Sequence, residues 1–288
     1  MASMRDIRRR IRSVGNTAKI TKAMQMVAAS KMRKAQQSAI NFRHFSTLLY
    51  RFQRKATTQT ADFTHPLLDV REVRKRAVIL IAGDKGLCGP LNSNLFRIAS
   101  KFDSETTLFI TAGRRAAQWV ARTRRKLVAE FAYGDSPRYV EAKAIANFAT
   151  DLFQKKDVDA VLIVSTRFIN TLRQEPVTLE LLPIGAIKGI VMPELLTEEQ
   201  LKADQLEYVF EPNPEAFLGY LLSHYLGLVL YQALLGAKAS EQSARMIAMK
   251  NATDNANTLI SDLSLEYNKL RQGKITTELL EISAAVAA

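Results

Sequence analysis

Two long stretches without proline, one at each end of the 288-residue sequence, constrain its fold more than any other feature. Residues 3–57 contain no proline and one glycine, Gly15, and are rich in Ala, Lys, Arg, Gln and Met. No proline follows Pro214, which itself suits the first turn of a helix. Because these compositions favour helix, we predict a long helix at each end of the chain.

Both stretches place apolar or small residues at alternating steps of three and four, the spacing of a coiled-coil seam. The two series are Met4, Ile7, Ile11, Val14, Ala18, Thr21, Gln25, Ala28, Met32, Ala35, Ala39, Phe42, Ser46 and Leu49, and Met246, Met249, Thr253, Ala256, Ile260, Leu263, Tyr267 and Leu270. Since each seam needs a partner, we predict one long antiparallel coiled coil. If the first helix ends at the same height as the second begins, where both meet the inserted domain, residue 57 lies beside residue 213. Residue 3 then lies beside residue 267.

The residues between the helices read as an inserted domain, which divides the chain into 1–57, 58–212 and 213–288. Runs typical of strands alternate there with runs typical of helices. The strands are predicted at Ala77–Ala82, Thr106–Thr111, Leu127–Tyr133, Ala160–Ser165 and Val177–Ile184, and the helices at Leu91–Lys101, Arg114–Thr123 and Tyr139–Lys155. Near-continuous apolar strands that alternate with helices predict an open, mostly parallel α/β sheet of Rossmann-like type, covered on both faces.

The whole net charge of +13 belongs to the first predicted helix. Residues 1–55 hold fourteen bases and one acid, Asp6, whereas the other 233 residues hold 27 of each. This excess indicates an acidic or polyanionic partner. A basic coiled coil that binds nucleic acid is the alternative function, but the bases are not interleaved with aromatic residues and no DNA-binding signature follows. A mitochondrial transit peptide and a merely solvated basic face are two further interpretations; the seam, which continues past residue 50, argues against the former.

A glycine-rich turn follows the first predicted strand, from Gly83 to Asn92. Its G-x-x-G-x-x-G spacing matches neither the dinucleotide nor the phosphate-loop motif, and Pro90 removes one amide donor, so we favour a structural turn over a ligand site. The single cysteine, Cys88, excludes an internal disulfide, and the three histidines lack metal-ligand spacing. We therefore expect no catalytic site, metal or cofactor. We also expect no membrane span, because no apolar run approaches about 18 residues.

Four blocks of sequence carry a resemblance that covers nearly the whole chain. They are MRDIR at 4–8 with SVGNTAKITKAMQMVAASKM at 13–32, GDKGLCG at 83–89, ASEQSARMIAMKNATDNA at 239–256, and ITTELLEI at 275–282. Together they resemble the gamma subunit of F-type ATP synthases. One departure is Ala285-Val286, where that family usually has a Gly-Ala pair.

The resemblance implies a non-catalytic rotor that couples ion flow to ATP synthesis and hydrolysis. In that family the coiled coil is a shaft inside a ring of alpha and beta subunits, and ATP and Mg²⁺ bind those subunits. The central domain stands on the membrane-embedded c-subunit ring beside the epsilon subunit. By the same resemblance, the protein is expected on the cytoplasmic face of the bacterial inner membrane, as a peripheral part of the synthase.

The resemblance also implies contact residues at three levels of the rotor. Arg33 and Lys34 are expected to face acidic levers of the catalytic subunits, Arg271 and Gln272 to meet loops of the ring, and Tyr208, Phe210 and Glu211 to form the foot against the c-ring and epsilon. Beyond the predicted coiled coil, residues 268–285 continue as a single helix. Its apolar residues, Leu279 and Ile282 among them, are expected to cover most of its circumference inside an apolar sleeve.

Overall fold

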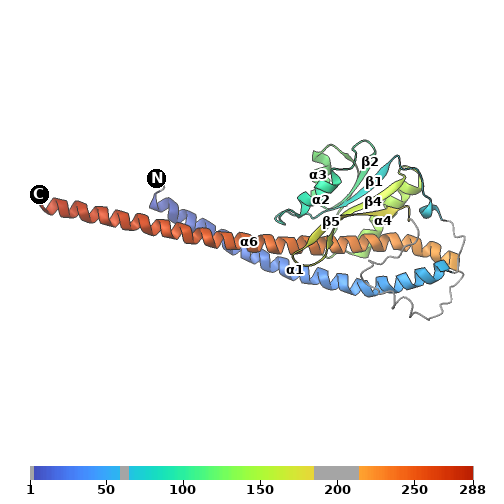
Figure 1. Cartoon of the computed structure of the whole chain (residues 1–288), viewed down its shortest axis with the longest axis horizontal. Helices are drawn as coiled ribbons and strands as arrows, with labels where there is room; N and C mark the ends of the chain where they lie inside the picture. The colour runs from blue at the N-terminus through green and yellow to red at the C-terminus, as the bar shows by residue number, and fades with distance from the viewer. Residues whose placement is uncertain (1–2, 59–64, 185–213, 288) are drawn as a thin grey trace. The chain divides into compact units, whose positions relative to one another are not determined.

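The computed structural model describes residues 3–58, 65–184 and 214–287 (Figure 1). Helix α1 spans Met4–Thr58 and helix α6 spans Pro214–Ala287, which confirms the two long terminal helices. The contacts divide the chain into two compact units. The α/β unit comprises residues 30–244, and the two-helix unit comprises residues 1–29 and 245–288.

The α/β unit is built on a five-stranded sheet in the order β3-β2-β1-β4-β5. The strands are β1 Arg76–Ile81, β2 Thr107–Ala112, β3 Lys126–Phe131, β4 Ala160–Phe168 and β5 Gln174–Leu182. All neighbouring pairs are parallel except β4 with β5, which is antiparallel. The prediction of a mostly parallel α/β sheet is therefore confirmed.

Helices cover both faces of this sheet (Figure 1). Helices α2 (Leu91–Ala99) and α3 (Arg114–Arg122) pack on the face that contains Val78 and Phe109. Helix α4 (Tyr139–Gln154), the short 3-10 helix η1 (Pro66–Leu68) and the first half of α6 pack on the face that contains Ile79. Strands β1, β2 and β4 are buried on both sides, so their sequences are largely apolar runs, whereas the edge strands β3 and β5 are partly exposed.

The first half of α6 is apolar enough to resemble a membrane-crossing helix. Between Gly219 and Ser283 it has an 18-residue window with a mean hydropathy of 1.2, and 53% of that window is buried within the protein. Leu222, Leu226 and Leu230 of this half belong to the core under the sheet. Since the core of the α/β unit already uses this apolar face, we interpret α6 as a core helix. The absence of a membrane span stays a prediction.

The two-helix unit is antiparallel, and its seam is the predicted one. The buried seam residues are Ile7, Ala18, Thr21 and Ala28 on α1 and Met249, Thr253, Ala256 and Leu263 on α6. At the centre of the seam the hydroxyls of Thr21 and Thr253 are 2.7 Å apart. Towards the end of the unit, Arg8 Nη2 donates a hydrogen bond of 2.6 Å to Tyr267 Oη. These cross-helix partners confirm the seam and define its register.

The predicted register was wrong by about one helical turn. The pairs Arg8–Tyr267 and Thr21–Thr253 place residue 3 opposite residue 271 or 272, whereas the sequence prediction placed it opposite residue 267. The prediction assumed that the helices are level where they enter the domain, and nothing in a coiled-coil pattern fixes that level. The unpaired part of α6 consequently begins near residue 272. It extends roughly 24 Å to Ala287, at about 1.5 Å per residue.

Candidate functional site

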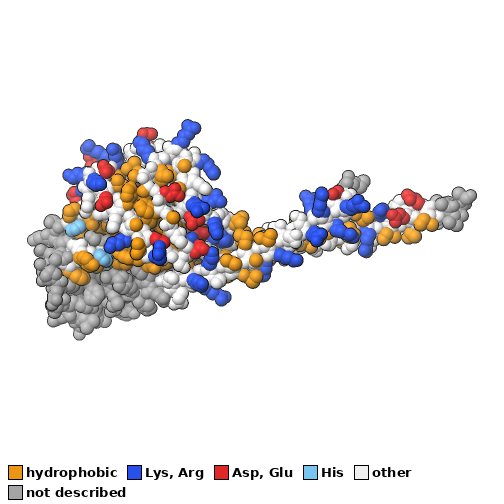
Figure 2. All heavy atoms as spheres, turned by 180° about the vertical axis from the view of Figure 1, so that it is seen from behind, with side chains coloured by type: hydrophobic (Ala, Val, Ile, Leu, Met, Phe, Trp, Pro, Cys, Tyr) orange, Lys and Arg blue, Asp and Glu red, His pale blue; other side chains and the backbone are white. Residues whose placement is uncertain are grey.

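The two-helix unit presents a basic surface on α1. Arg5, Arg9, Arg10, Arg12, Lys19 and Lys22 are all exposed, and Figure 2 shows Lys and Arg side chains along this part of the molecule. Further along α1, Arg33 and Lys34 are exposed on the α/β unit. The bases that the sequence singled out are therefore accessible to a partner.

Large apolar side chains lie exposed among these bases. Ile20, Met26 and Val27 of α1 are 61%, 60% and 55% exposed, and they are close in sequence to Lys19 and Lys22. Apolar groups gathered within a charged surface mark a site of protein–protein contact. The arrangement suits a protein partner that is both acidic and partly apolar.

The unpaired end of α6 is exposed on every described residue from Arg271 and Gln272 to Ser283. Leu279 and Ile282 are 61% and 62% exposed, and with Ile275 they share one face of the helix by their spacing of four and seven. Glu278 and Glu281, three residues apart, lie on an adjacent face. Leu280, 64% exposed, lies on another side of the helix. Over the described residues the apolar surface of the tip therefore covers part of the circumference and not most of it. Tyr208, Phe210 and Glu211, predicted at the foot, lie outside the described residues.

The glycine-rich turn after β1 is held by contacts within the α/β unit. The N–H groups of Arg114 and Arg115 donate to Asp84 Oδ1 (3.0 Å) and to the Gly83 carbonyl (3.2 Å). A β-carbon at Gly83 would lie 2.8 Å from Oε2 of Glu241 on α6. A carboxylate packed this closely against the turn would repel a phosphate, so this geometry supports the structural interpretation of the glycine-rich motif.

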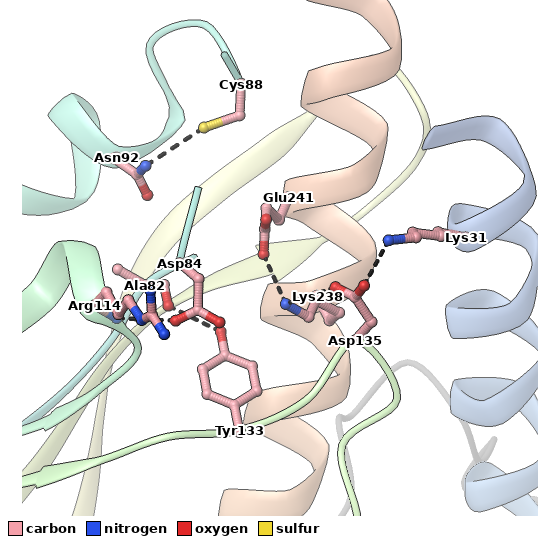
Figure 3. Close-up of polar contacts among 10 residues, drawn as sticks. All are labelled: Lys31, Ala82, Asp84, Cys88, Asn92, Arg114, Tyr133, Asp135, Lys238 and Glu241. Atoms are coloured by element: carbon pink, nitrogen blue, oxygen red, sulfur yellow. Dashed lines mark hydrogen bonds and ion pairs between the residues drawn. The ribbon is translucent and has the colours of Figure 1, made fainter. Parts of the chain in front are cut away.

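Beside this turn lies a cluster of four charged side chains that the sequence analysis missed (Figure 3). Lys238 Nζ of α6 is 3.1 Å from Glu241 Oε2 and 3.4 Å from Asp135 Oδ1, and Lys31 Nζ of α1 is 2.5 Å from Asp135 Oδ2. We call Lys31, Asp135, Lys238 and Glu241 the ion cluster. The only signal in the sequence is the i, i+3 spacing of Lys238 and Glu241, because the partners on α1 and after β3 are remote in sequence.

Two groups in and beside the ion cluster, Asp135 and Tyr133, have shifted pKa values. The hydrogen bond from Lys31, and secondarily the charge of Lys238, hold the pKa of Asp135 below its ordinary 3.8, although partial burial opposes this. The contact therefore stabilises the fold at neutral pH, and this stabilisation is lost as the pH falls through the lowered pKa. Burial, and then the charges of Glu241, Asp84 and Asp135, raise the pKa of Tyr133 well above its usual value. Its hydroxyl thus stays protonated and donates to the Ala82 carbonyl at 2.9 Å.

Sequence comparisons identify proteins that are similar to this chain. A family model described as ATP synthase matches residues 3–288. The ATP synthase gamma chain of Opitutus terrae is 45% identical over 289 residues, which cover 99% of this chain and 98% of that one. The gamma chain of Cupriavidus necator is 39% identical over 298 residues, which cover the whole of both chains.

Comparisons of structure agree. A chain from the central stalk and c-ring structure of the Tetrahymena thermophila mitochondrial ATP synthase is 26% identical, with a TM-score of 0.61 over 81% of this chain and 99% of that one. A rotor chain of the Euglena gracilis mitochondrial enzyme, 19% identical, shares the fold with a TM-score of 0.66 over 94% of this chain and 98% of that one. With a family match over nearly its whole length and full-length relatives above 30% identity, this chain belongs to the gamma chains of the ATP synthases.

Proposed function

We propose that this gamma chain turns as the central rotor of its synthase and couples ion flow through a membrane ring to ATP synthesis and hydrolysis. As a gamma chain it is a non-catalytic subunit of the complex. The observation that carries the proposal is the two-helix unit, which leaves a basic surface on α1 and an apolar face on the tip of α6 exposed. Such surfaces suit a shaft that is enclosed by other subunits.

The proposed mechanism is a shift of populations. An asymmetric shaft contacts each surrounding catalytic site differently at each angle, and it therefore favours a different conformation at each site. We place the alpha and beta subunits around the two-helix unit, and the epsilon subunit and the c-ring at the foot. This arrangement puts the chain on the cytoplasmic face of a bacterial inner membrane. ATP and Mg²⁺ bind the alpha and beta subunits.

Reconstitution with and without this chain tests the proposed function. We expect vesicles that carry the complete synthase to make ATP when a pH gradient is imposed, and vesicles that lack only the gamma chain to make none. In the complete complex, a probe attached to an exposed residue of the α/β unit, such as Lys143, should rotate during ATP hydrolysis. Gradient-driven ATP synthesis without this chain, or a stationary probe during hydrolysis, would contradict the proposal.

Reversing two exposed bases should slow assembly of the complex. Arg33 and Lys34 are exposed, and charges at such positions attract an acidic partner over roughly a Debye length, ~8 Å at physiological salt. Their effect is mainly on the association rate. We expect R33E/K34E to reconstitute more slowly than the wild type at low salt, with a difference that shrinks as salt is added. Stopped-flow or time-resolved activity measurements give the rate.

The matched control is R122E/K143E, which makes the same change in net charge at exposed positions of the α/β unit. If assembly is steered by net charge alone, both double variants slow it equally. If salt and the R33E/K34E substitutions both leave the rate unchanged, the steering role of α1 is ruled out.

A further inference from the structure

The ion cluster lies where three parts of the α/β unit meet (Figure 3). Lys31 comes from α1, Asp135 from the loop after β3, and Lys238 and Glu241 from α6. Asp135 accepts from Lys31 with Oδ2 and pairs with Lys238 through Oδ1, so that one carboxylate joins the two long helices. The cluster contains two positive and two negative charges and is neutral as a whole.

The α6 part of the cluster is removed from water. Lys238 and Glu241 are each 2% exposed, and every residue from Ala237 to Ser243 is buried. The ammonium group of Lys238 has three N–H bonds, and it faces Glu241, Asp135 and the ring of Tyr133, whose centroid is 4.9 Å away. A buried cation with matched partners is held in one geometry, because any rotation of the helix separates it from them.

Hydrogen bonds connect this region of α6 to β4 and the loop after it. Ser240 Oγ donates to the carbonyl of Thr166 at 3.4 Å, and Ser243 Oγ donates to that of Thr171 at 2.7 Å. At the end of β1 the contact is one of close packing, because a β-carbon at Gly83 would lie 2.7 Å from Cδ of Glu241. The helix is therefore held by hydrogen bonds at the end of β4 and by close packing at the end of β1.

Nearer the start of α6, the contacts with the sheet differ in kind. Leu222, Leu226, Leu230 and Leu234 pack in the apolar core of the α/β unit. Rotation of the helix about its axis would move these close-packed side chains out of the core, so they also resist it. The polar contacts of residues 238–243 add partners of fixed geometry to this packing.

We propose that the ion cluster is the joint through which torque passes between the α/β unit and helix α6. Lys238 and Glu241 are then positioning residues of the rotor, since they fix the angle of α6 relative to the sheet. The inference rests on the proposed rotor function and adds the site at which rotation of the α/β unit is transferred to the helix.

The test compares two double variants of the assembled synthase in vesicles. K238M/E241Q removes one positive and one negative charge and leaves the Lys31–Asp135 pair in place. The control, K126M/E105Q, makes the same exchange at an exposed pair, whose side chains are 52% and 80% exposed. The readouts are the number of protons pumped per ATP hydrolysed and the angular spread of a probe on the α/β unit during pauses in rotation.

We expect K238M/E241Q to broaden the angular spread and to lower the protons pumped per ATP by roughly twofold or more, while the control matches the wild type. The proposal is overturned if both variants show the same number of protons pumped per ATP and the same angular spread of the probe. It is also overturned if the K238M/E241Q complex melts at a lower temperature but pumps normally. If the proposed rotor function itself is wrong, the result is different. Proton pumping by the wild-type complex would then not depend on the gamma chain.

Discussion

Replacing Leu279 and Ile282 together by glutamate is expected to prevent assembly of the synthase. Both side chains lie on the apolar face of the unpaired end of α6, and both are more than 60% exposed in the chain alone. If other subunits enclose this face, the two carboxylates are buried without partners. The effective penalty is several kcal/mol for each buried ion, so the affinity should fall by about a thousandfold or more. The yield of assembled complex on size-exclusion chromatography measures the effect.

The matched control for the tip is L279A/I282A, which shortens the same side chains without adding charge. A sleeve that makes only apolar, non-directional contacts should accept this variant with a moderate loss of affinity. Normal assembly of L279E/I282E would refute enclosure of the tip. Equal failure of both variants would show that the shape of these side chains, and not their apolar character, is what the partner recognises.

The second large effect is expected from Lys238→Met, which removes the central cation of the ion cluster. Glu241, which is 2% exposed, then loses its ion pair with Lys238, whose Nζ lies 3.1 Å from Oε2. Breaking a buried ion pair at one end costs about 3–5 kcal/mol. We expect the free energy of unfolding to fall by that amount. Urea unfolding can be followed by the fluorescence of Trp119, the single tryptophan, which stacks on Phe96 within the α/β unit.

Two further variants test whether the loss of stability in K238M comes from the buried ion pair. The K126M variant breaks an exposed lysine–glutamate pair and should lose at most about 1 kcal/mol. Adding E241Q to K238M removes the buried carboxylate charge that Lys238 had balanced and should recover most of the loss. A deficit that is small, or that E241Q does not reduce, would show that the cluster stabilises the fold little.

Most of the fold could be predicted because its determinants are local. Proline-free stretches and a three–four seam define α1 and α6, and apolar runs define β1, β2 and β4. The register of the two-helix unit could not be predicted, because it depends on where each helix leaves the domain. Contacts such as Arg8–Tyr267 fix it, and no repeating pattern in the sequence pairs these two residues.

The ion cluster could not be predicted from the sequence for a related reason. Asp135 lies in a loop, and only the fold brings it into contact with Lys31, 104 positions away in the sequence. The burial of Lys238 is also not expected from its residue type, because lysine is almost never fully buried unless it is paired. The exposed bases of α1, by contrast, were predictable, because their function requires no specific neighbour within the chain.

The seam that joins Thr21 to Thr253 also determines when this protein can finish folding. The two residues are 232 positions apart, and at a synthesis rate of roughly 5–20 residues per second about 12–46 s separate their appearance from the ribosome. Throughout this interval the seam of α1 has no α6 to pack against, so its apolar residues stay uncovered on the nascent chain. A chain whose translation stops before Met249, the first buried seam residue of α6 beyond residue 245, has the seam of α1 but nothing to cover it.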